Sequence, residues 1–413
     1  MSDLFEDYRC YVILYFDMAP VSIYLHIPFC RHRCNYCDFN TYAGHEKQIP
    51  AYLRALRHEI AFLGKSAGSR LPAHTVFFGG GTPSLVPPDE IRLVLEQIAK
   101  RFDLLPEAEI TMEANPGTVS KSQLSALRAA GVNRLSFGMQ SSHPEELRLL
   151  ERIHSFTDVI DAVRWSRQAG FDNLSLDLIF GLPFQSLARW KDTLECALAL
   201  RTEHLSLYAL TVEPGTRLHT WVRRGIVPAP DEDEAAEMYE YAMERLERDG
   251  LRQYEISNWA RSSESGVDYA SRHNVQYWSD LPYLGLGAGA HGYAAGVRTA
   301  NVDGIGQYIR RMENENDLAF PLSPANKVSE AIDRSTEMQE WMMVGLRLTE
   351  QGVSRAVFCE RFNQELGTVF GHEISELTRV GLLEWVGERQ DRLRLTRKGR
   401  LLGNQVFMRF VGN

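Results

Sequence analysis

Short apolar segments of strand type alternate with longer segments of helix type from residue 21 to residue 210. Strands are expected at 21–27, 74–78, 109–113, 134–138, 173–179 and 204–210, and helices at 50–63, 88–101, 120–130, 145–151, 157–169 and 187–200. This alternation is typical of parallel β/α units. The sequence therefore predicts an α/β fold built on an open or partial (β/α) barrel.

Chemically distinctive residues come at the ends of these predicted strands. They are Cys30, Cys34 and Cys37 after the first strand, Gly79-Gly80-Gly81-Thr82-Pro83 after the second, Glu113 at the end of the third, Gln140 after the fourth and Asp177 late in the fifth. In β/α barrels the functional residues lie at the carboxyl ends of the strands. The pattern therefore predicts a single site at that edge of the sheet, where the glycines allow close approach of backbone to a ligand.

The three cysteines have the spacing C-x₃-C-x₂-C, which places three thiols on one loop. Thiolates of this kind hold iron–sulfur clusters, and three of them leave one iron of a four-iron cluster open to an outside ligand. The same thiols are also suited to zinc, with His26, His32 or His45 as a fourth ligand. A structural role without metal is the third alternative. The residues alone leave all three open.

The cysteine motif, its flanks Tyr24–Phe29 and Asp38–Phe39, and the glycine turn after it resemble the radical S-adenosylmethionine (SAM) family. Within that family they resemble the oxygen-independent coproporphyrinogen III oxidase group, which includes a heme chaperone branch. The resemblance extends over about residues 18–413. It implies a partial (β/α)₆ barrel, a [4Fe-4S] cluster on the three cysteines and SAM bound to the open iron.

The resemblance also implies which residues contact SAM. They are Tyr24, Tyr36, Gly80, Gly81, Thr82, Glu113, Gln140, Arg152, Asp177 and Ala209, with His291 as a looser match. Each has an ordinary structural alternative: a tight turn for the glycines, a solvated strand end for Glu113, a surface helix position for Arg152, and a cap or buried ion pair for Asp177. No catalytic residue is assigned.

The segment His273-Asn274-Val275-Gln276-Tyr277-Trp278 resembles the heme-binding signature of the chaperone branch. The resemblance implies that His273 is the axial ligand of heme iron, with Asn274, Tyr277 and Trp278 completing the motif. Imidazole is a common axial ligand, and the two aromatic rings offer flat apolar faces to a porphyrin. The alternative is that His273 is a polar loop residue and that Tyr277 and Trp278 belong to the core.

Two departures separate the chain from the oxidases of this group. Those enzymes carry a further cysteine two residues after the third, where this chain has Phe39, and a longer segment before the cluster than Met1–Phe29. The sequence thus favours a heme chaperone that delivers heme to respiratory or other heme proteins. The alternatives are oxidative decarboxylation of coproporphyrinogen III to protoporphyrinogen IX, and a HemN-like radical SAM methyltransferase that uses two SAM molecules. Cleavage of SAM would require a low-potential electron donor.

Composition limits the location and the partners of the protein. A net charge of −9 argues against general affinity for nucleic acid. Six cysteines in 413 residues do not form a disulfide framework and suit a reducing cytoplasm. Apolar runs are too short for a membrane span, so we expect at most peripheral association with a membrane.

The chain is expected to divide into four parts. Residues 1–17 are predicted to be an N-terminal extension, 18–256 the radical SAM barrel, 257–323 a heme-motif and linker region with 257–303 read as loop, and 324–413 a C-terminal domain that is mostly helical. Helices near 353–363 and 371–379, followed by a hairpin from 383 to 395, predict a winged-helix-like unit at the end.

Overall fold

The computed structural model describes residues 20–263, 266–314 and 317–412, and its chain divides into two compact bodies. The barrel body contains Pro20–Arg245 and Tyr283–Glu330, and the C-terminal body contains Leu246–Pro282 and the residues from Ala331 onward. These divisions differ from the predicted boundaries after residues 256 and 323. The predicted extension 1–17 lies outside the described residues.

The barrel body is built on parallel strands that are neighbours in the same order as in the sequence. They are β1 (Val21–Ile27), β4 (Pro72–Gly80), β5 (Asp103–Ala114), β6 (Arg134–Gln140), β7 (Leu174–Phe180) and β8 (His204–Ala209). Their interiors are largely buried and apolar, as expected for parallel strands covered on both faces. The six predicted strands and the partial (β/α) barrel are therefore confirmed.

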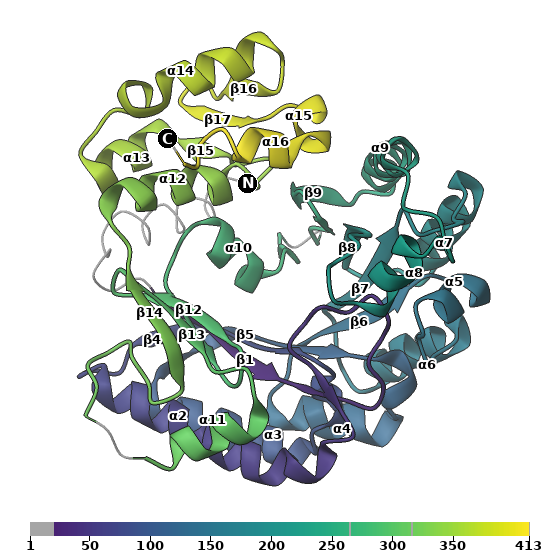
Figure 1. The fold of residues 1–413 in the computed structure, drawn as a ribbon, viewed down its shortest axis with the longest axis vertical. Coiled ribbons are helices and arrows are strands. Elements are labelled where there is room, and N and C mark those ends of the chain that lie inside the picture. The colour runs from purple at the N-terminus through teal and green to yellow at the C-terminus, as the bar shows by residue number, and fades with distance from the viewer. Residues whose placement is uncertain (1–19, 264–265, 315–316, 413) are drawn as a thin grey trace. The chain divides into compact units, whose positions relative to one another are not determined.

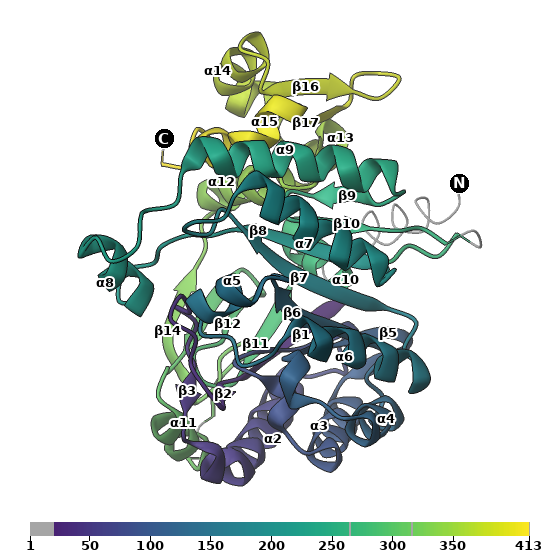
Figure 2. The same cartoon turned by 90° about the vertical axis from the view of Figure 1, so that its right-hand side faces the viewer.

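Helices connect these strands and cover the sheet (Figure 1; Figure 2). They are α2 (Ile49–Ser66), α3 (Pro88–Arg101), α4 (Lys121–Ala130), α5 (Pro144–Leu149), α6 (Phe156–Gln168) and α7 (Leu187–Ala199), with the 3-10 turns η1 (Glu46–Gln48), η2 (Pro83–Leu85) and η3 (Pro116–Thr118). Serine side chains cap the first turns of α4, α6 and α7 through Ser120, Ser155 and Ser186. The predicted helices are confirmed. After β8 come α8 (Arg217–Arg223) and α9 (Glu232–Arg248).

A second group of strands extends the sheet of the barrel body beyond β1. It consists of β11 (Tyr283–Leu286), β12 (His291–Ala294), β13 (Val297–Asn301) and β14 (Asn326–Ala331), with α11 (Ile305–Met312) between the last two. β11 pairs with β1 in parallel, and β12 and β13 form an antiparallel hairpin. The prediction of loop for 257–303 is therefore wrong, and the part from residue 324, predicted to be mostly helical, begins with the strand β14.

The C-terminal body has its own apolar core. Its elements are the hairpin strands β9 (Arg252–Glu255) and β10 (Asn258–Ala260), α10 (Arg272–Trp278), α12 (Arg334–Gly345), β15 (Val353–Ser354), α13 (Arg355–Phe362), α14 (Leu366–Arg379), β16 (Leu383–Val386), β17 (Arg392–Leu395), α15 (Arg397–Leu401) and α16 (Gly403–Phe407). Trp341, Phe358 and Phe370 are among the side chains buried in this core. A three-stranded sheet in the order β15-β17-β16 lies with α13 and α14, so the predicted winged-helix-like unit is confirmed.

Within the described residues, none of the helices combines the length and the apolarity needed to cross a membrane.

Candidate functional site

The three cysteines lie on a loop that two short strands close at its base. β2 (Phe29–Cys30) pairs in parallel with β3 (Tyr42–Ala43), so the chain leaves and returns at the same place. The backbone N–H of Tyr42 also donates to the carbonyl of Pro28 at 2.7 Å. We call residues 30–41 the cysteine loop, because these contacts hold its two ends together at the carboxyl end of β1.

The glycine turn, residues 79–83, is attached directly to the start of the cysteine loop. The N–H groups of Gly81 and Thr82 donate to the carbonyls of Ile27 and Phe29, both at 2.8 Å. A Cβ atom at Gly81 would lie 2.6 Å from the Phe29 oxygen and 3.0 Å from Cys30 Sγ, which leaves room only for glycine. The two motifs that the sequence singled out are therefore parts of one local structure.

Each thiol has a polar side chain beside it. Thr82 Oγ1 lies 3.6 Å from Cys30 Sγ, Arg152 Nη1 lies 3.7 Å from Cys34 Sγ, and Thr41 Oγ1 lies 3.8 Å from Cys37 Sγ. None of the three cysteines is in a disulfide with another described residue. Burial raises the pKa of the Cys30 and Cys37 thiols. Three free thiols on one loop, with donors able to stabilise sulfur charge, fit a cluster ligated by three cysteines.

Each of the three histidines considered as a fourth zinc ligand bonds another group in this structure. His26 bonds Tyr24 and the carbonyl of Asn40, His32 bonds Glu151 at 3.1 Å, and His45 bonds Gln48 at 3.3 Å. Across the described ranges of the chain, no three His, Cys, Asp or Glu side chains converge as the ligands of a single metal ion do. Thiolates of a cluster bind different irons, so they need not converge on one point.

Two partly buried carboxyl groups lie beside the glycine turn. The N–H of Gly80 donates to Glu113 Oε2 at 3.0 Å, and the hydroxyl of Ser136 donates to Asp177 at 2.9 Å. Burial, reinforced by the negative charge of Asp177, raises the pKa of Glu113 to about 8. Burial also raises the pKa of Asp177. A partly buried acidic pair of this kind is suited to a cationic ligand group, which would stabilise the charged carboxylates.

Arg152 connects the acidic pair to the cysteine loop. Its guanidinium lies beside Cys34 and Tyr36, donates to the carbonyl of Gly138 at 2.9 Å, and lowers the pKa of Asp177 against the effect of burial. Gln140 lies on a bulge of β6 with a positive φ of 63°. Among the described atoms, Gln140 Oε1 and Arg152 Nε are buried without a hydrogen-bond partner. Such orphaned polar atoms fit a site that takes a polar ligand.

The structure thus brings the predicted SAM residues of the barrel body together, from Tyr24 beside Glu113 to Arg152 beside Cys34. Ala209 ends β8 and is exposed, and His291 begins β12 near His26. A pocket in this region is lined by Arg31, His32, Cys34, Thr82, Asn115, Thr118, Glu151 and Ile153.

Sequence reasoning missed the residues that support the acidic pair. Ser136 and Ser206 hydrogen-bond Asp177, and the charge of Arg134 lowers the pKa of both carboxyl groups. Arg134 is buried at the start of β6. A signal was available in the alternation of side chains along β6 and β8. Ser and Arg at inward-facing positions of otherwise apolar strands require polar partners, so they indicate a polar site inside the barrel.

The heme motif forms helix α10 in the C-terminal body. The Ser271 hydroxyl caps this helix by accepting from the N–H of Asn274. His273 and Tyr277 are one helical turn apart, with His273 Nε2 and the Tyr277 hydroxyl 2.8 Å apart and their rings packed edge to face. His273 is buried on a helix, so the polar-loop alternative for this residue is wrong.

Trp278 does not present both faces to a ligand. The guanidinium of Arg347 stacks on its ring at 4.1 Å from the centroid, which corrects the expectation of a freely available flat surface. Arg347 also bonds the buried Glu255 at 3.2 Å. At the end of α10, Arg361 pairs with Asp280 at 2.8 Å and with Glu337 at 2.7 Å. The C-terminal body therefore holds the motif helix through two arginines.

Comparison with known proteins identifies the domains of the chain. The family model described as the radical SAM superfamily matches residues 24–197, and the model described as the HemN C-terminal domain matches residues 332–402. The chain is 22% identical to a solved structure of coproporphyrinogen III oxidase (HemN) from Escherichia coli, with a TM-score of 0.79, covering 97% of this chain and 92% of that one. This likeness shows the fold, which is that of a radical SAM protein.

Relatives of known name are similar over nearly the whole chain. The heme chaperone HemW of Bacillus subtilis is 38% identical over 393 residues, which are 95% of this chain and 99% of the relative. A mitochondrial radical S-adenosyl methionine domain-containing protein 1 of Bos taurus is 43% identical over 377 residues, 88% of this chain and 81% of the relative. The chain therefore belongs to the HemW family of radical SAM proteins.

Proposed function

We propose that the protein is a heme chaperone that binds heme through His273 and passes it to heme-requiring proteins. The observation that carries this proposal is the motif helix α10, in which His273 and Tyr277 share one face and Trp278 is fixed by Arg347. A neutral imidazole is a suitable axial ligand for heme iron. Relatives named heme chaperone HemW support the same activity.

The site in the barrel body is proposed to hold a [4Fe-4S] cluster and SAM. Cys30, Cys34 and Cys37 would ligate the cluster, which supplies an electron for reductive cleavage of SAM when both are bound. We propose that Glu113, which accepts the N–H of Gly80, receives the amino group of SAM. We propose further polar contacts to SAM for Gln140, Arg152 and Asp177, supported by the buried Gln140 Oε1 and Arg152 Nε, which have no hydrogen-bond partner among the described atoms.

Decarboxylation of coproporphyrinogen is not the function that we favour. Phe39, at the position where the oxidases carry a further cysteine, is 63% exposed and ligates nothing. The likeness to the E. coli oxidase is one of fold at 22% identity. For a protein that we propose to be cytoplasmic, the proposed partners are heme, respiratory or other heme proteins as acceptors, and a low-potential electron donor for cleavage of SAM.

The test is titration of anaerobically purified protein with heme, followed by its visible spectrum. We expect the wild-type protein to bind heme at one site, and His273→Ala to weaken binding by at least about tenfold, because an axial bond to iron is lost. Iron and sulfide content should be unchanged in this variant. His372→Ala is the matched control, since His372 is an exposed histidine on α14 of the same body.

Two outcomes contradict the proposal. One is unchanged heme affinity in His273→Ala. The other is formation of protoporphyrinogen when the protein is incubated with coproporphyrinogen, SAM and a reductant, which would indicate the oxidase.

A further inference from the structure

Asn40 fastens the end of the cysteine loop to a distant part of the chain. Its Nδ2 group donates to the carbonyls of Ala288 at 3.0 Å and Asp303 at 2.9 Å. Its own backbone carbonyl accepts from His26 Nε2 at 2.9 Å. Both amide hydrogens are therefore used on segments far away in sequence, and Asn40 comes three residues after Cys37.

Two neighbours make this contact specific. The Tyr42 hydroxyl donates to the same Asp303 carbonyl at 3.2 Å. Gly289 has a positive φ of 78°, and a Cβ atom there would overlap the side-chain amide of Asn40. The turn formed by residues 287–290 thus accepts the side chain of Asn40 only because it carries glycine at 289.

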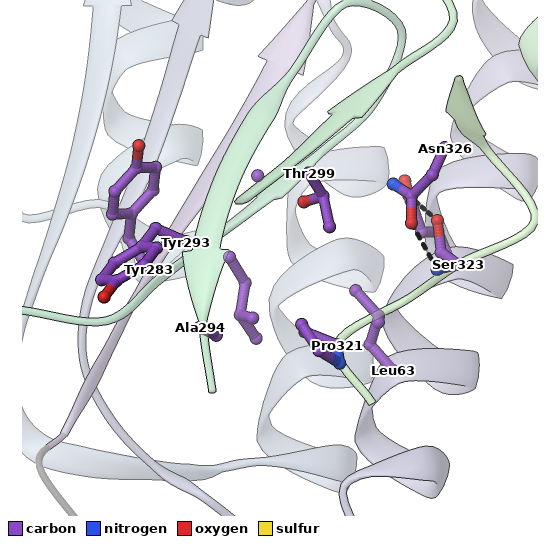
Figure 3. Close-up of a pocket in the computed structure, with 11 residues that line it drawn as sticks. Leu63, Tyr283, Tyr293, Ala294, Thr299, Pro321, Ser323 and Asn326 are labelled. Carbon is purple, nitrogen blue, oxygen red and sulfur yellow. Dashed lines mark hydrogen bonds between the residues drawn. The ribbon is translucent and has the colours of Figure 1, made fainter. Parts of the chain in front are cut away.

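The turn that receives Asn40 is itself anchored to α2 by a buried carboxylate. Glu59 accepts from four donors: the N–H of Gly287 at 2.9 Å, Asn301 Nδ2 at 2.9 Å, the Ser323 hydroxyl at 2.8 Å and the Tyr308 hydroxyl at 2.7 Å. A carboxylate with all its acceptor sites filled holds its surroundings rigidly. Glu59 also lines a pocket in which Thr299, Ser323 and Asn326 gather on one side, away from Tyr283 and Tyr293 (Figure 3).

We infer that Asn40 is a positioning residue for the iron–sulfur cluster, and that it acts by donating a hydrogen bond to the 287–290 turn. The inference rests on the cluster proposed above. The cysteine loop is closed at its start by the glycine turn, through Gly81 and Thr82, and at its end by Asn40 and Tyr42. Loss of the Asn40 side-chain bonds leaves the end of the loop after Cys37 held by the pairing of β3 with β2 and by the bond between His26 and the Asn40 carbonyl, with its link to Ala288 broken. The cluster then becomes more accessible to water and oxygen, which changes its lifetime and its reduction potential.

The central variant is Asn40→Asp, which keeps the shape of the side chain and removes both amide donors. Gly289→Ala disrupts the same contact from the turn, because its Cβ atom would overlap the side-chain amide of Asn40. Asn314→Asp is the matched control, because Asn314 is exposed and its side-chain amide donates to the carbonyl of Arg310 at 3.2 Å, far from the cysteine loop in sequence. The measurements are iron per chain after anaerobic purification, decay of cluster absorbance in air, and the cluster's reduction potential.

We expect Asn40→Asp and Gly289→Ala to lose cluster absorbance in air at least about fivefold faster than the wild type, since each lost hydrogen bond shifts an equilibrium by about that factor. The reduction potentials of the two variants should both shift from the wild-type value, and in the same direction as each other. Asn314→Asp should have the decay rate and the reduction potential of the wild type. Tyr42→Phe removes one bond and should give an intermediate decay, so it serves as the milder variant if Asn40→Asp fails to fold.

Folded variants with wild-type iron content, decay and potential would overturn the inference. A wild-type protein that binds no iron would instead overturn the proposed cluster.

Discussion

Glu113 is the residue whose chemistry the structure defines most sharply. Its partly buried carboxyl group lies near Asp177 and accepts the N–H of Gly80, and desolvation raises its pKa to about 8. At neutral pH the ligand-free carboxyl is therefore mostly protonated. To pair with an ammonium group it must first lose that proton.

We expect the affinity for SAM to rise with pH, by up to about tenfold per unit between about pH 6 and 7.5. Over this range the amino group of the ligand stays charged, because an α-amino group titrates near 7.7–8.0. Calorimetry in buffers of different ionisation enthalpy should detect release of one proton on binding. Glu113→Gln should bind more weakly and without this pH dependence, and a wild-type affinity independent of pH would contradict the role of Glu113.

At the scale of residues, the sequence allowed prediction of the groups that carry distinctive chemistry. The cysteines, the glycine turn, Glu113 and Asp177 could be named because each lies late in a predicted strand or just after one. Arg134 and Ser136 were missed, although polar residues at alternate positions of an apolar strand were a signal for them. Asn40 could not be predicted, because its role depends on which turns become neighbours. Asn40 contacts Ala288 and Asp303 only after the chain has folded, and no local sequence pattern predicts that contact.

At the scale of elements, the heme-motif helix α10 is held at its end by the contact between Arg361 and Asp280. Asp280 lies just after the helix with a φ of 51°, and Arg361 also binds its backbone carbonyl at 3.2 Å. Burial, together with the charges of Glu337 and Glu340, raises the pKa of Asp280 to about 7 despite the opposing effect of Arg361. The folded form therefore holds a proton that the opened form releases between its ordinary pKa near 3.8 and 7.

This linkage has a definite sign. Because the pKa of Asp280 is higher in the folded form, protonation of Asp280 stabilises that form relative to the opened one. This contribution is complete below about pH 4 and is lost as the pH rises through 7. The free energy of opening α10 should therefore fall with rising pH, by at most about 1.4 kcal/mol per unit for one proton. Hydrogen exchange of the peptide spanning α10, corrected for intrinsic rates, measures this slope.

Asp280→Asn should flatten that slope relative to wild type, since it removes the titrating group but keeps the side-chain shape. An equal slope in both proteins would show that another group controls the opening.

The elements that the sequence predicted wrongly share a physical cause. The described residues between 257 and 303 form strands of three to five residues and one helix of seven, separated by glycine turns such as Gly287 and Gly296 with positive φ. Strands this short are stabilised by pairing with β1 and with one another rather than by their own periodicity. The long β/α units carried a repeated pattern, and they were predicted almost to their ends.

At the scale of the whole molecule, the proposed cluster site and the proposed heme site lie in different bodies. Each site is held by contacts within its own body. The cysteine loop is held by the glycine turn, Asn40 and the Glu59 network, all in the barrel body. The heme motif is held by Arg347 and Arg361 in the C-terminal body. Each site is therefore expected to form without the other.

This separation predicts the behaviour of a cluster variant. Cys34→Ser should lose most of its iron, because a cluster with only two thiolate ligands is poorly held. It should still bind heme with an affinity within about threefold of wild type, since no hydrogen bond to α10 is altered. Cys196→Ser, at a thiol outside the loop, should keep both the iron and the heme affinity. If Cys34→Ser lost heme binding together with the cluster, the two sites would be energetically coupled and the cluster would have to be counted as part of the heme site.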